Sequence, residues 1–409
     1  MIPRIREVDV RNYKSIAQVK VGLEPFTVFV GRNGVGKSNL IDSLAFVQDC
    51  LSESLEQAFR TRGGIGAVRR RSGGHPTHMG ISLTIDFADG VIAKYGFEIA
   101  AKPNEGFQVA HEKCEVRKFR FGSSECEDAH VFEVAKGKFK QAIPGLRPQV
   151  QPDRLALFAA SATEEFRPVF DFLTSMRVYS VVPSRLRELQ EPDAGTFLKS
   201  DGSNAAAVLK RLAEGSNGSH RYETLCRLLS KIVSGLERVE YRAVGQKETI
   251  QFKQDVGQKH PWGFNALNMS DGTLRALGLL LAVYQPGNPS VIAVEEPEAT
   301  VHPAVMELIV GVLKDAARER QILLTTHSPD MLDDKELDEN SIRMVTLEQS
   351  KTLVCTLSEA SRTAIRDNLY TAGELLRSNE LTPDLQTARK QAEQMDLFAH
   401  VPPPDTDAE

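Results

Sequence analysis

Residues 31–38 read Gly-Arg-Asn-Gly-Val-Gly-Lys-Ser, which fits the phosphate-binding pattern G-x-x-x-x-G-K-[ST]. The apolar run FTVFV at 26–30 comes directly before this stretch, and apolar residues recur with helical spacing from 38 to 48. In such a strand–loop–helix unit, glycines let backbone N–H groups turn toward phosphate oxygens, and the helix N-terminus adds partial positive charge. Because both flanks are present, the pattern favours a phosphate-binding loop over a chance glycine turn.

The loop residues divide into backbone donors and side chains with separate tasks. Lys37 is expected to reach the terminal phosphates of a nucleotide, and Ser38 is expected to ligate Mg²⁺. We therefore predict that ATP and Mg²⁺ are bound here. The residues predicted to contact the nucleotide are Gly31, Arg32, Asn33, Gly34, Val35, Gly36, Lys37, Ser38 and Asn39.

Residues 291–298, VIAVEEPE, place consecutive carboxylates at the end of an apolar strand. In a P-loop protein this strand end lies beside the phosphate loop, where one acid can hold the metal and the next can activate water. We assign Glu295 to Mg²⁺ and Glu296 to the catalytic base. Without the phosphate loop, a solvated acidic turn after a buried strand would be the simpler interpretation.

A histidine follows the next apolar strand. Residues 325–329 read TTHSP after the run 322–324, so His327 is expected at the same edge of the sheet. There it can hydrogen-bond the γ-phosphate and the attacking water. Lone histidines are more often structural, and we leave the following in that class: His75, His78, His111, His130 and His400.

The order of elements indicates the fold class. Strand-like runs fill 4–31, and short β-like runs recur from 81 to 139, which predicts an antiparallel sheet. Residues 155–237 have a mainly helical pattern, and 238–254 return to strands.

From residue 262 onward, helical and strand patterns alternate, which is typical of a mostly parallel α/β sheet. The expected elements are helix 270–284, strand 291–294, helix 303–319, strand 322–326 and a strand pair near 342–357. We divide the chain into 1–150, with the phosphate loop and antiparallel region; 151–261, a mainly helical insertion; 262–357, a second α/β part; and 358–409, a tail with a helix near 383–395 and a disordered end, VPPPDTDAE.

Composition excludes several classes of protein. With 409 residues, 41% hydrophobic and 26% charged, the chain is globular and not collagen-like, mucin-like or wholly disordered. The longest apolar run, 277–284, is too short to span a bilayer, and the first ten residues lack the apolar core of a secretion signal. Five scattered cysteines without a CxxC pair indicate a reduced, cytoplasmic protein. A net charge of −5 argues against a basic nucleic-acid coat, although a local patch stays possible.

These motifs, together with LNMSDGT at 267–273 before a helix, resemble the ABC-type ATPases. More narrowly they resemble the RecF/SMC branch and the overcoming-lysogenization-defect (OLD) ATPases, AAA family ATPases of the AAA_21 type. There GxNGxGKSN, a Ser-x-Gly signature, an EEPE-type acidic motif with a following HP, and THSP occur in this order. The resemblance covers about 1–150 and 262–357 and implies a P-loop NTPase of the ABC-ATPase head type. Its mixed central sheet would carry an antiparallel β lobe and a helical insertion.

The resemblance also implies a homodimer or higher homo-oligomer with two ATP molecules between heads. Ser270 and the Gly272 amide would then bind a γ-phosphate in trans, and the segment RNYKS at 11–15 would lie near the nucleotide. Two features depart from the family pattern. Glu295 stands where most ABC proteins have aspartate, and MSDGT replaces LSGGQ, which disfavours a transporter. We find no pattern for the long coiled coil of SMC proteins, and we expect no TOPRIM nuclease domain, since only 52 residues follow Leu357.

The Arg/Gly stretch 60–74, RTRGGIGAVRRRSGG, is expected to be an irregular loop. Its arginines could contact nucleic-acid phosphates, but no aromatic residues are interleaved with them, which favours a solvated or partner-contacting loop.

The leading hypothesis is an ATP-hydrolysing switch whose head dimerisation gates a separate effector, for example a nuclease in antiphage defence or DNA repair. One alternative is a RecF-like ATP-dependent DNA clamp, with DNA contacts from the 155–260 insertion. Salt-dependent duplex DNA binding with ATP, absent with ADP, would distinguish that clamp. A transporter nucleotide-binding subunit is disfavoured by the signature, and we expect no membrane association.

Overall fold

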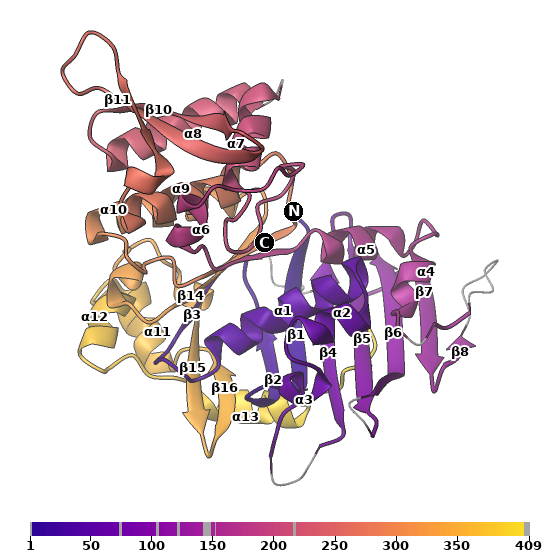
Figure 1. Ribbon diagram of the computed structural model, residues 1–409. Coiled ribbons are helices and arrows are strands. Elements are labelled where there is room, and N and C mark those ends of the chain that lie inside the picture. Colours follow the sequence, from indigo (N-terminus) through magenta and orange to yellow (C-terminus); the bar gives the residue numbers. More distant parts are fainter. Residues whose placement is uncertain are drawn as a thin grey trace.

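The computed structural model describes residues 2–72, 76–103, 106–120, 123–141, 149–151, 153–215 and 218–404. The described strands form three sheets. A seven-stranded antiparallel sheet has the order β2 (Ile16–Gly22), β1 (Arg4–Tyr13), β4 (His78–Asp86), β5 (Val91–Ala101), β6 (Phe107–Phe119), β7 (Cys126–Ala135) and β8 (Lys138–Gln141). It lies at the lower right of Figure 1.

The central sheet has six strands and carries the phosphate loop. Its order is β16 (Lys351–Cys355), β15 (Ile342–Glu348), β3 (Phe26–Val30), β14 (Gln321–Thr326), β13 (Val291–Glu295) and β9 (Arg177–Tyr179). All neighbouring strands are parallel except β15 and β16. The predicted mixed central sheet and antiparallel β lobe are therefore confirmed.

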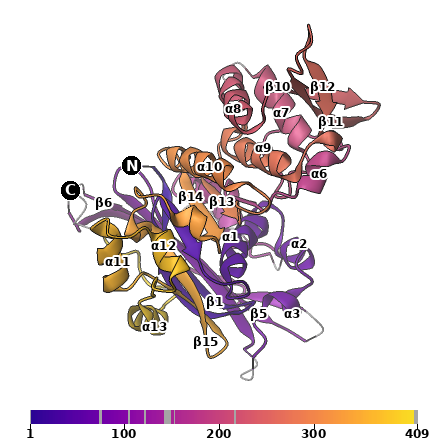
Figure 2. The ribbon, with the colours of Figure 1, turned by 90° about the vertical axis from the view of Figure 1, so that its left-hand side faces the viewer.

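A third sheet, β10 (Leu236–Val244), β11 (Lys247–Gln254) and β12 (Trp262–Asn265), forms an upper lobe with helices α7 (Ala205–Glu214) and α8 (Gly218–Ile232) (Figure 1). The remaining helices are α1 (Lys37–Ser52), α2 (Leu55–Arg60), α3 (Ile65–Val68), α4 (Ala156–Ala160), α5 (Arg167–Thr174), α6 (Pro183–Arg187), α9 (Asp271–Tyr284), α10 (Pro303–Ala316), α11 (Glu359–Arg366), α12 (Ala372–Arg377) and α13 (Leu385–Glu393). Figure 2 shows α9 and α10 between this upper lobe and the central sheet.

The alternation of side chains along the central strands explains the layering. On β13, Val291 and Ala293 belong to the core shared by α1 and the seven-stranded sheet, whereas Ile292 and Val294 belong to the core shared with α7 to α10. Successive side chains of a strand point to opposite faces, so an apolar strand such as β13 must be covered on both sides. The site-bearing strand ends are thus held between two hydrophobic cores.

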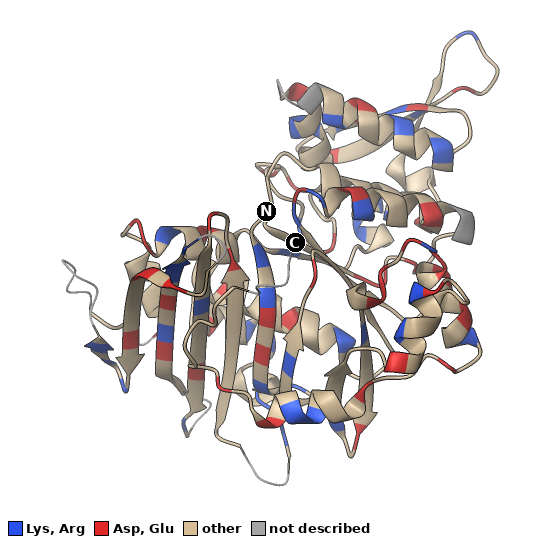
Figure 3. Ribbon diagram, turned by 180° about the vertical axis from the view of Figure 1, so that it is seen from behind, with Lys and Arg blue, Asp and Glu red and all other residues tan. Residues whose placement is uncertain are grey.

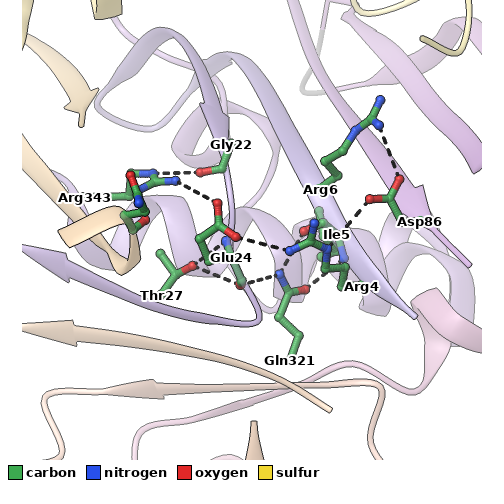
Figure 4. Close-up of polar contacts among 10 residues, drawn as sticks. Arg4, Ile5, Arg6, Gly22, Glu24, Thr27, Asp86, Gln321 and Arg343 are labelled. Carbon is green, nitrogen blue, oxygen red and sulfur yellow. Dashed lines mark hydrogen bonds and ion pairs between the residues drawn. The ribbon is translucent and has the colours of Figure 1, made fainter. Parts of the chain in front are cut away.

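A buried glutamine joins the two larger sheets at the end opposite the phosphate loop (Figure 4). The Gln321 side chain accepts a hydrogen bond from the Ile5 N–H (2.9 Å) and donates to the carbonyls of Ile5 (2.8 Å) and Glu24 (3.0 Å). Arg343 of β15 donates to the Gly22 carbonyl at 2.8 Å. Because these groups satisfy one another while buried, they fix the relative position of β1, β14 and β15.

Residues of both charges occur on neighbouring strands of the seven-stranded sheet (Figure 3). Lys20 of β2 pairs with Glu7 of β1 at 2.9 Å, whereas Lys113 and Glu115, which pair at 3.1 Å, both belong to β6. Opposite charges on adjacent strands neutralise one another.

In the part of the chain that the structure describes, no helix combines the length and apolar character needed to cross a bilayer.

Several sequence-based expectations were wrong in detail. The stretch 60–74 contains the short helix α3, although residues 73–75 lie outside the described residues. The mainly helical stretch 155–237 includes β9, whose three residues are too few to show a strand periodicity. The tail has α11 and α12 in addition to the predicted helix, here α13. Val401, assigned to the disordered end, is buried against Ile92 and Phe119, while 405–409 lie outside the described residues.

Candidate functional site

The phosphate-binding loop connects β3 to α1 with a backbone that requires glycine. Gly34 and Gly36 have φ angles of 80° and 108°, in the left-handed region that other residues rarely adopt. A Cβ on Gly36 would also lie 2.5 Å from Oγ1 of Thr352 and 2.9 Å from Oγ of Ser15. The loop is therefore packed from the side by β16 and by the turn after β1. Sequence analysis missed Thr352, since its strand lies more than 300 residues from the loop.

The side chain of Lys37 lies against the start of the phosphate loop. Its Nζ donates to the carbonyls of Gly31 (2.7 Å) and Arg32 (3.0 Å), and the residue is buried. Burial lowers the pKa of Lys37, and the nearby carboxylates of Glu296 and Glu298 oppose this. The ammonium group is thus already held among acceptors at the place where phosphate oxygens would add negative charge.

A pocket of about 200 Å³ lies over the start of α1. Its lining residues are Asn33, Gly34, Gly36, Lys37, Ser38, Asn39 and Glu296. Gly36 caps α1 without a side-chain hydrogen bond, so the first N–H groups of the helix can donate hydrogen bonds to an anion. The structure thus brings Glu296 together with most of the predicted loop residues, whereas Val35 is buried and Arg32 is exposed outside the pocket.

The order of central strands brings the acidic and histidine motifs to the same edge. β14 pairs with β3 on one side and β13 on the other, all parallel, with Thr326 opposite Val30 and Thr325 opposite Glu295. Carboxyl ends of parallel strands meet at one sheet edge, which is where open α/β sheets bind ligands. The predicted juxtaposition of the phosphate loop, Glu295 and His327 follows from this pairing.

Glu295 lies against the serine of the phosphate loop. Burial raises the pKa of the Glu295 carboxyl, and a hydrogen bond with the Ser38 side chain opposes the rise. A hydroxyl and a carboxylate in contact beside a phosphate loop are the protein donors that Mg²⁺ takes when phosphates supply the other ligands. The residues present therefore fit a magnesium ion.

Glu296 has a strained backbone and faces the pocket. Its φ of 43° is uncommon for a residue with a side chain, and its N–H donates to the Thr325 carbonyl at 3.0 Å. One carboxylate oxygen lies 3.5 Å from Nδ1 of His327. Strained backbone at such positions is maintained by surrounding contacts and often serves function. Here it directs the Glu296 side chain into the pocket.

An arginine that sequence analysis missed supports this turn. Arg275 of α9 is buried and donates to the carbonyls of Glu295 (3.0 Å) and Glu296 (2.7 Å). Glu298 was also missed; it is the third acid of the EEPE stretch and contacts His327. The acid-rich motif was a signal for Glu298, but nothing in the sequence pairs Arg275 with that motif.

The signature residues lie at the start of α9. Ser270 is exposed and caps the helix by accepting a hydrogen bond from the Thr273 N–H at 3.2 Å. Gly272 packs so closely that a Cβ would lie 2.9 Å from the Thr300 carbonyl oxygen. Neither Ser270 nor Gly272 lines the pocket over the phosphate loop of the same chain. The signature residues are therefore not part of the site over the chain's own phosphate loop.

The turn after β1 also contacts α1. Lys14, at a φ of 47°, pairs with Asp42 at 2.5 Å, and the Tyr13 hydroxyl donates to the same carboxylate at 2.5 Å. The Arg62 side chain completes this cluster by donating to Asp42 at 3.0 Å. Of the arginines considered for nucleic-acid contact, Arg62 is therefore part of the internal packing.

The neighbouring arginines also make internal contacts. Arg69 donates to the Pro76 carbonyl, and Arg70 donates to the carbonyls of Ser15 and Ser350. The contacts of Arg70 hold the described part of this stretch, residues 60–72, against the turn after β1 and the turn between β15 and β16.

Residues 26–125 and 170–333, well over half of the chain, match the model of a family described as AAA domain, putative AbiEii toxin, Type IV TA system. Among solved structures, the chain is similar to an Smc head bound to the C-terminal winged-helix domain of ScpA, with 14% identity, a TM-score of 0.53, and coverage of 87% of this chain and 98% of that one. It is also similar to an Smc head with extended coiled coil bound to the C-terminal domain of ScpA from Pyrococcus furiosus: 11% identity, TM-score 0.50, coverage 90% and 100%. The fold is that of an ABC-type ATPase head.

Proposed function

The chain belongs to the AAA_21 family of AAA domains, and on that basis we propose that it is an ATP-hydrolysing molecular switch. One observation carries the proposal: β3, β14 and β13 lie side by side and bring the phosphate loop, His327 and the Glu295–Glu296 pair to one sheet edge. A phosphate cradle, a metal-binding carboxylate and a base beside it are the parts that phosphoryl transfer from ATP to water requires.

In this proposal, the loop amides and Lys37 hold the phosphates, and Ser38 and Glu295 hold the metal. When bound, Mg²⁺ supplies positive charge that neutralises the phosphates. Glu296 accepts the proton of the attacking water, and its carboxylate lies in the pocket lining where such a water must stand. His327, close to Glu296, contacts the γ-phosphate and the water.

We further propose that two copies close on ATP. Ser270 is exposed at the N-terminus of α9, where helical N–H groups favour an anion, yet it does not line its own chain's pocket. A two-fold dimer would place Ser270 and Gly272 of each copy at the γ-phosphate held by the other. The same surface patch of both copies then forms both sites.

Closure of the dimer would gate a separate effector. The two Smc heads of similar fold have a domain of another protein, ScpA, bound to them, which supports a protein partner here. We propose an effector such as a nuclease in antiphage defence or DNA repair, acting in the cytoplasm. A RecF-like DNA clamp, with DNA contacts from the 155–260 insertion, is the alternative function; Arg62, Arg69 and Arg70 make internal contacts and add no further support to it.

Ser270→Arg is expected to leave ATP binding by one chain intact and to abolish hydrolysis. The larger side chain fills the place where Ser270 would meet the γ-phosphate held by the other copy, but Ser270 does not line the chain's own pocket. Steady-state hydrolysis and titration calorimetry with ATP would be measured together. Ser358→Arg is the matched control, because Ser358 caps α11 in the same way. Wild-type hydrolysis by the Ser270 variant would rule out the trans arrangement.

A further inference from the structure

Glu298 is a largely buried acid of the site, and its contacts converge on the histidine. Its side chain is only 10% exposed. One carboxylate oxygen, Oε1, accepts hydrogen bonds from the Thr326 hydroxyl (2.7 Å) and from the His327 N–H (3.2 Å). The same oxygen lies 3.5 Å from Nδ1 of His327. Glu298 therefore accepts a hydrogen bond from the backbone of His327 and also faces the imidazole ring of that residue.

The surroundings of the other oxygen of this carboxylate are different. Oε2 is buried and has no hydrogen-bond partner among the residues that the structure describes. The carboxylate acts electrostatically on Lys37 of the phosphate loop and on Arg275 of the signature helix, raising the pKa of both against the lowering by burial. A buried carboxylate oxygen without a donor lowers the stability of the fold, and groups that bear such a cost are often found at functional sites.

The histidine ring stands between two carboxylates of unequal exposure. Nδ1 is 3.5 Å from both Glu296 and Glu298, but the Glu296 side chain is 38% exposed, against 10% for Glu298, and among the described residues it has no anchor comparable to the Thr326 hydroxyl. Since Nδ1 faces the carboxylates, Nε2 is the ring nitrogen that remains for a phosphate oxygen or water. A histidine is usually oriented for a reaction by the hydrogen bond that its other ring nitrogen makes.

We propose that Glu298 is the positioning residue of His327: it fixes the ring so that Nε2 meets the γ-phosphate, and it leaves Glu296 to act as base. This inference rests on the proposed ATPase function. It assigns to the third acid of the EEPE motif a task distinct from metal binding and from water activation. Separations of 3.5 Å would shorten to hydrogen bonds once ATP is bound, as catalytic contacts often do.

Glu298→Gln retains the shape of the side chain and an oxygen for the Thr326 hydroxyl but removes the charge facing Nδ1. We expect kcat to fall by about 10- to 100-fold with KM for ATP unchanged, because only the orientation of one group is lost. His327→Ala should lower kcat at least as much, and adding Glu298→Gln to it should cause no further loss. Glu307→Gln, an exposed acid on α10, is the matched control.

Equal additional losses from Glu298→Gln with and without His327 would overturn the proposal, as would a rise in KM at constant kcat. If the glutamine variant does not fold, Thr326→Val tests the same contact by removing the hydroxyl that anchors Oε1. That variant should lower kcat in wild-type protein and not on the His327→Ala background. Absence of any ATPase activity in the unaltered protein would instead refute the proposed function itself.

Discussion

Glu296→Gln is expected to lower the rate of ATP hydrolysis by about 10² to 10⁴-fold while ATP and Mg²⁺ still bind. The amide keeps the shape of the side chain in the pocket but cannot accept the proton of water. Lys37, Ser38 and Glu295 are unchanged, so closed dimers should accumulate with ATP trapped between them. Single-turnover hydrolysis, read with the mass of the complex in ATP and in ADP, measures both effects.

Glu295→Gln separates the metal ligand from the base. It should shift the Mg²⁺ dependence and weaken nucleotide binding, because it alters the carboxylate in contact with Ser38. Glu336→Gln, whose side chain is 91% exposed, serves as the control for both variants. If Glu296→Gln turns over normally while Glu295→Gln traps ATP, the two assignments must be exchanged.

Lys37→Ala is expected to abolish ATP binding. The change removes the cation that the Gly31 and Arg32 carbonyls hold over the loop, and leaves the backbone amides without a charged partner in the pocket lining. Calorimetric titration with ATP measures the loss, and thermal melting checks that the variant is folded. Lys335→Ala, distant in sequence and outside the pocket lining, should bind ATP normally. Undiminished affinity in the Lys37 variant would refute the assignment of the loop.

The strand–loop–helix unit and three of the central strands could be predicted because their signals are local. FTVFV, VIAVE and QILLTT are short apolar runs that end in polar motifs, and each became a central strand with its motif at the carboxyl end. β9 could not be predicted, since its three residues are defined only by pairing with β13. Helix α3 forms within a glycine-rich stretch where Val68 and Ile65 are buried, a tertiary effect that outweighs local propensity.

The parts of the site that escaped prediction are contacts between distant segments. Thr352 fixes Gly36 from another strand, and Arg275 reaches the Glu295 and Glu296 carbonyls from the signature helix. Neither belongs to a sequence pattern, because a strand or helix register alone does not reveal which distant backbone a side chain meets. Glu298 was visible in the sequence as an acid, but its burial and its contact with His327 needed the fold.

Mixing two inactive variants tests most directly whether ATP is hydrolysed between two copies. Lys37→Ala removes phosphate binding, and Ser270→Arg blocks the signature, so neither variant alone should hydrolyse ATP. In a mixed dimer, the loop of the Ser270 variant faces the intact signature of the Lys37 variant, and one complete site remains. Equal mixing should restore about a quarter of the wild-type rate. Half of randomly paired dimers are mixed, and one of the two sites in each mixed dimer is complete. A mixture as inactive as its components would contradict a site shared between copies.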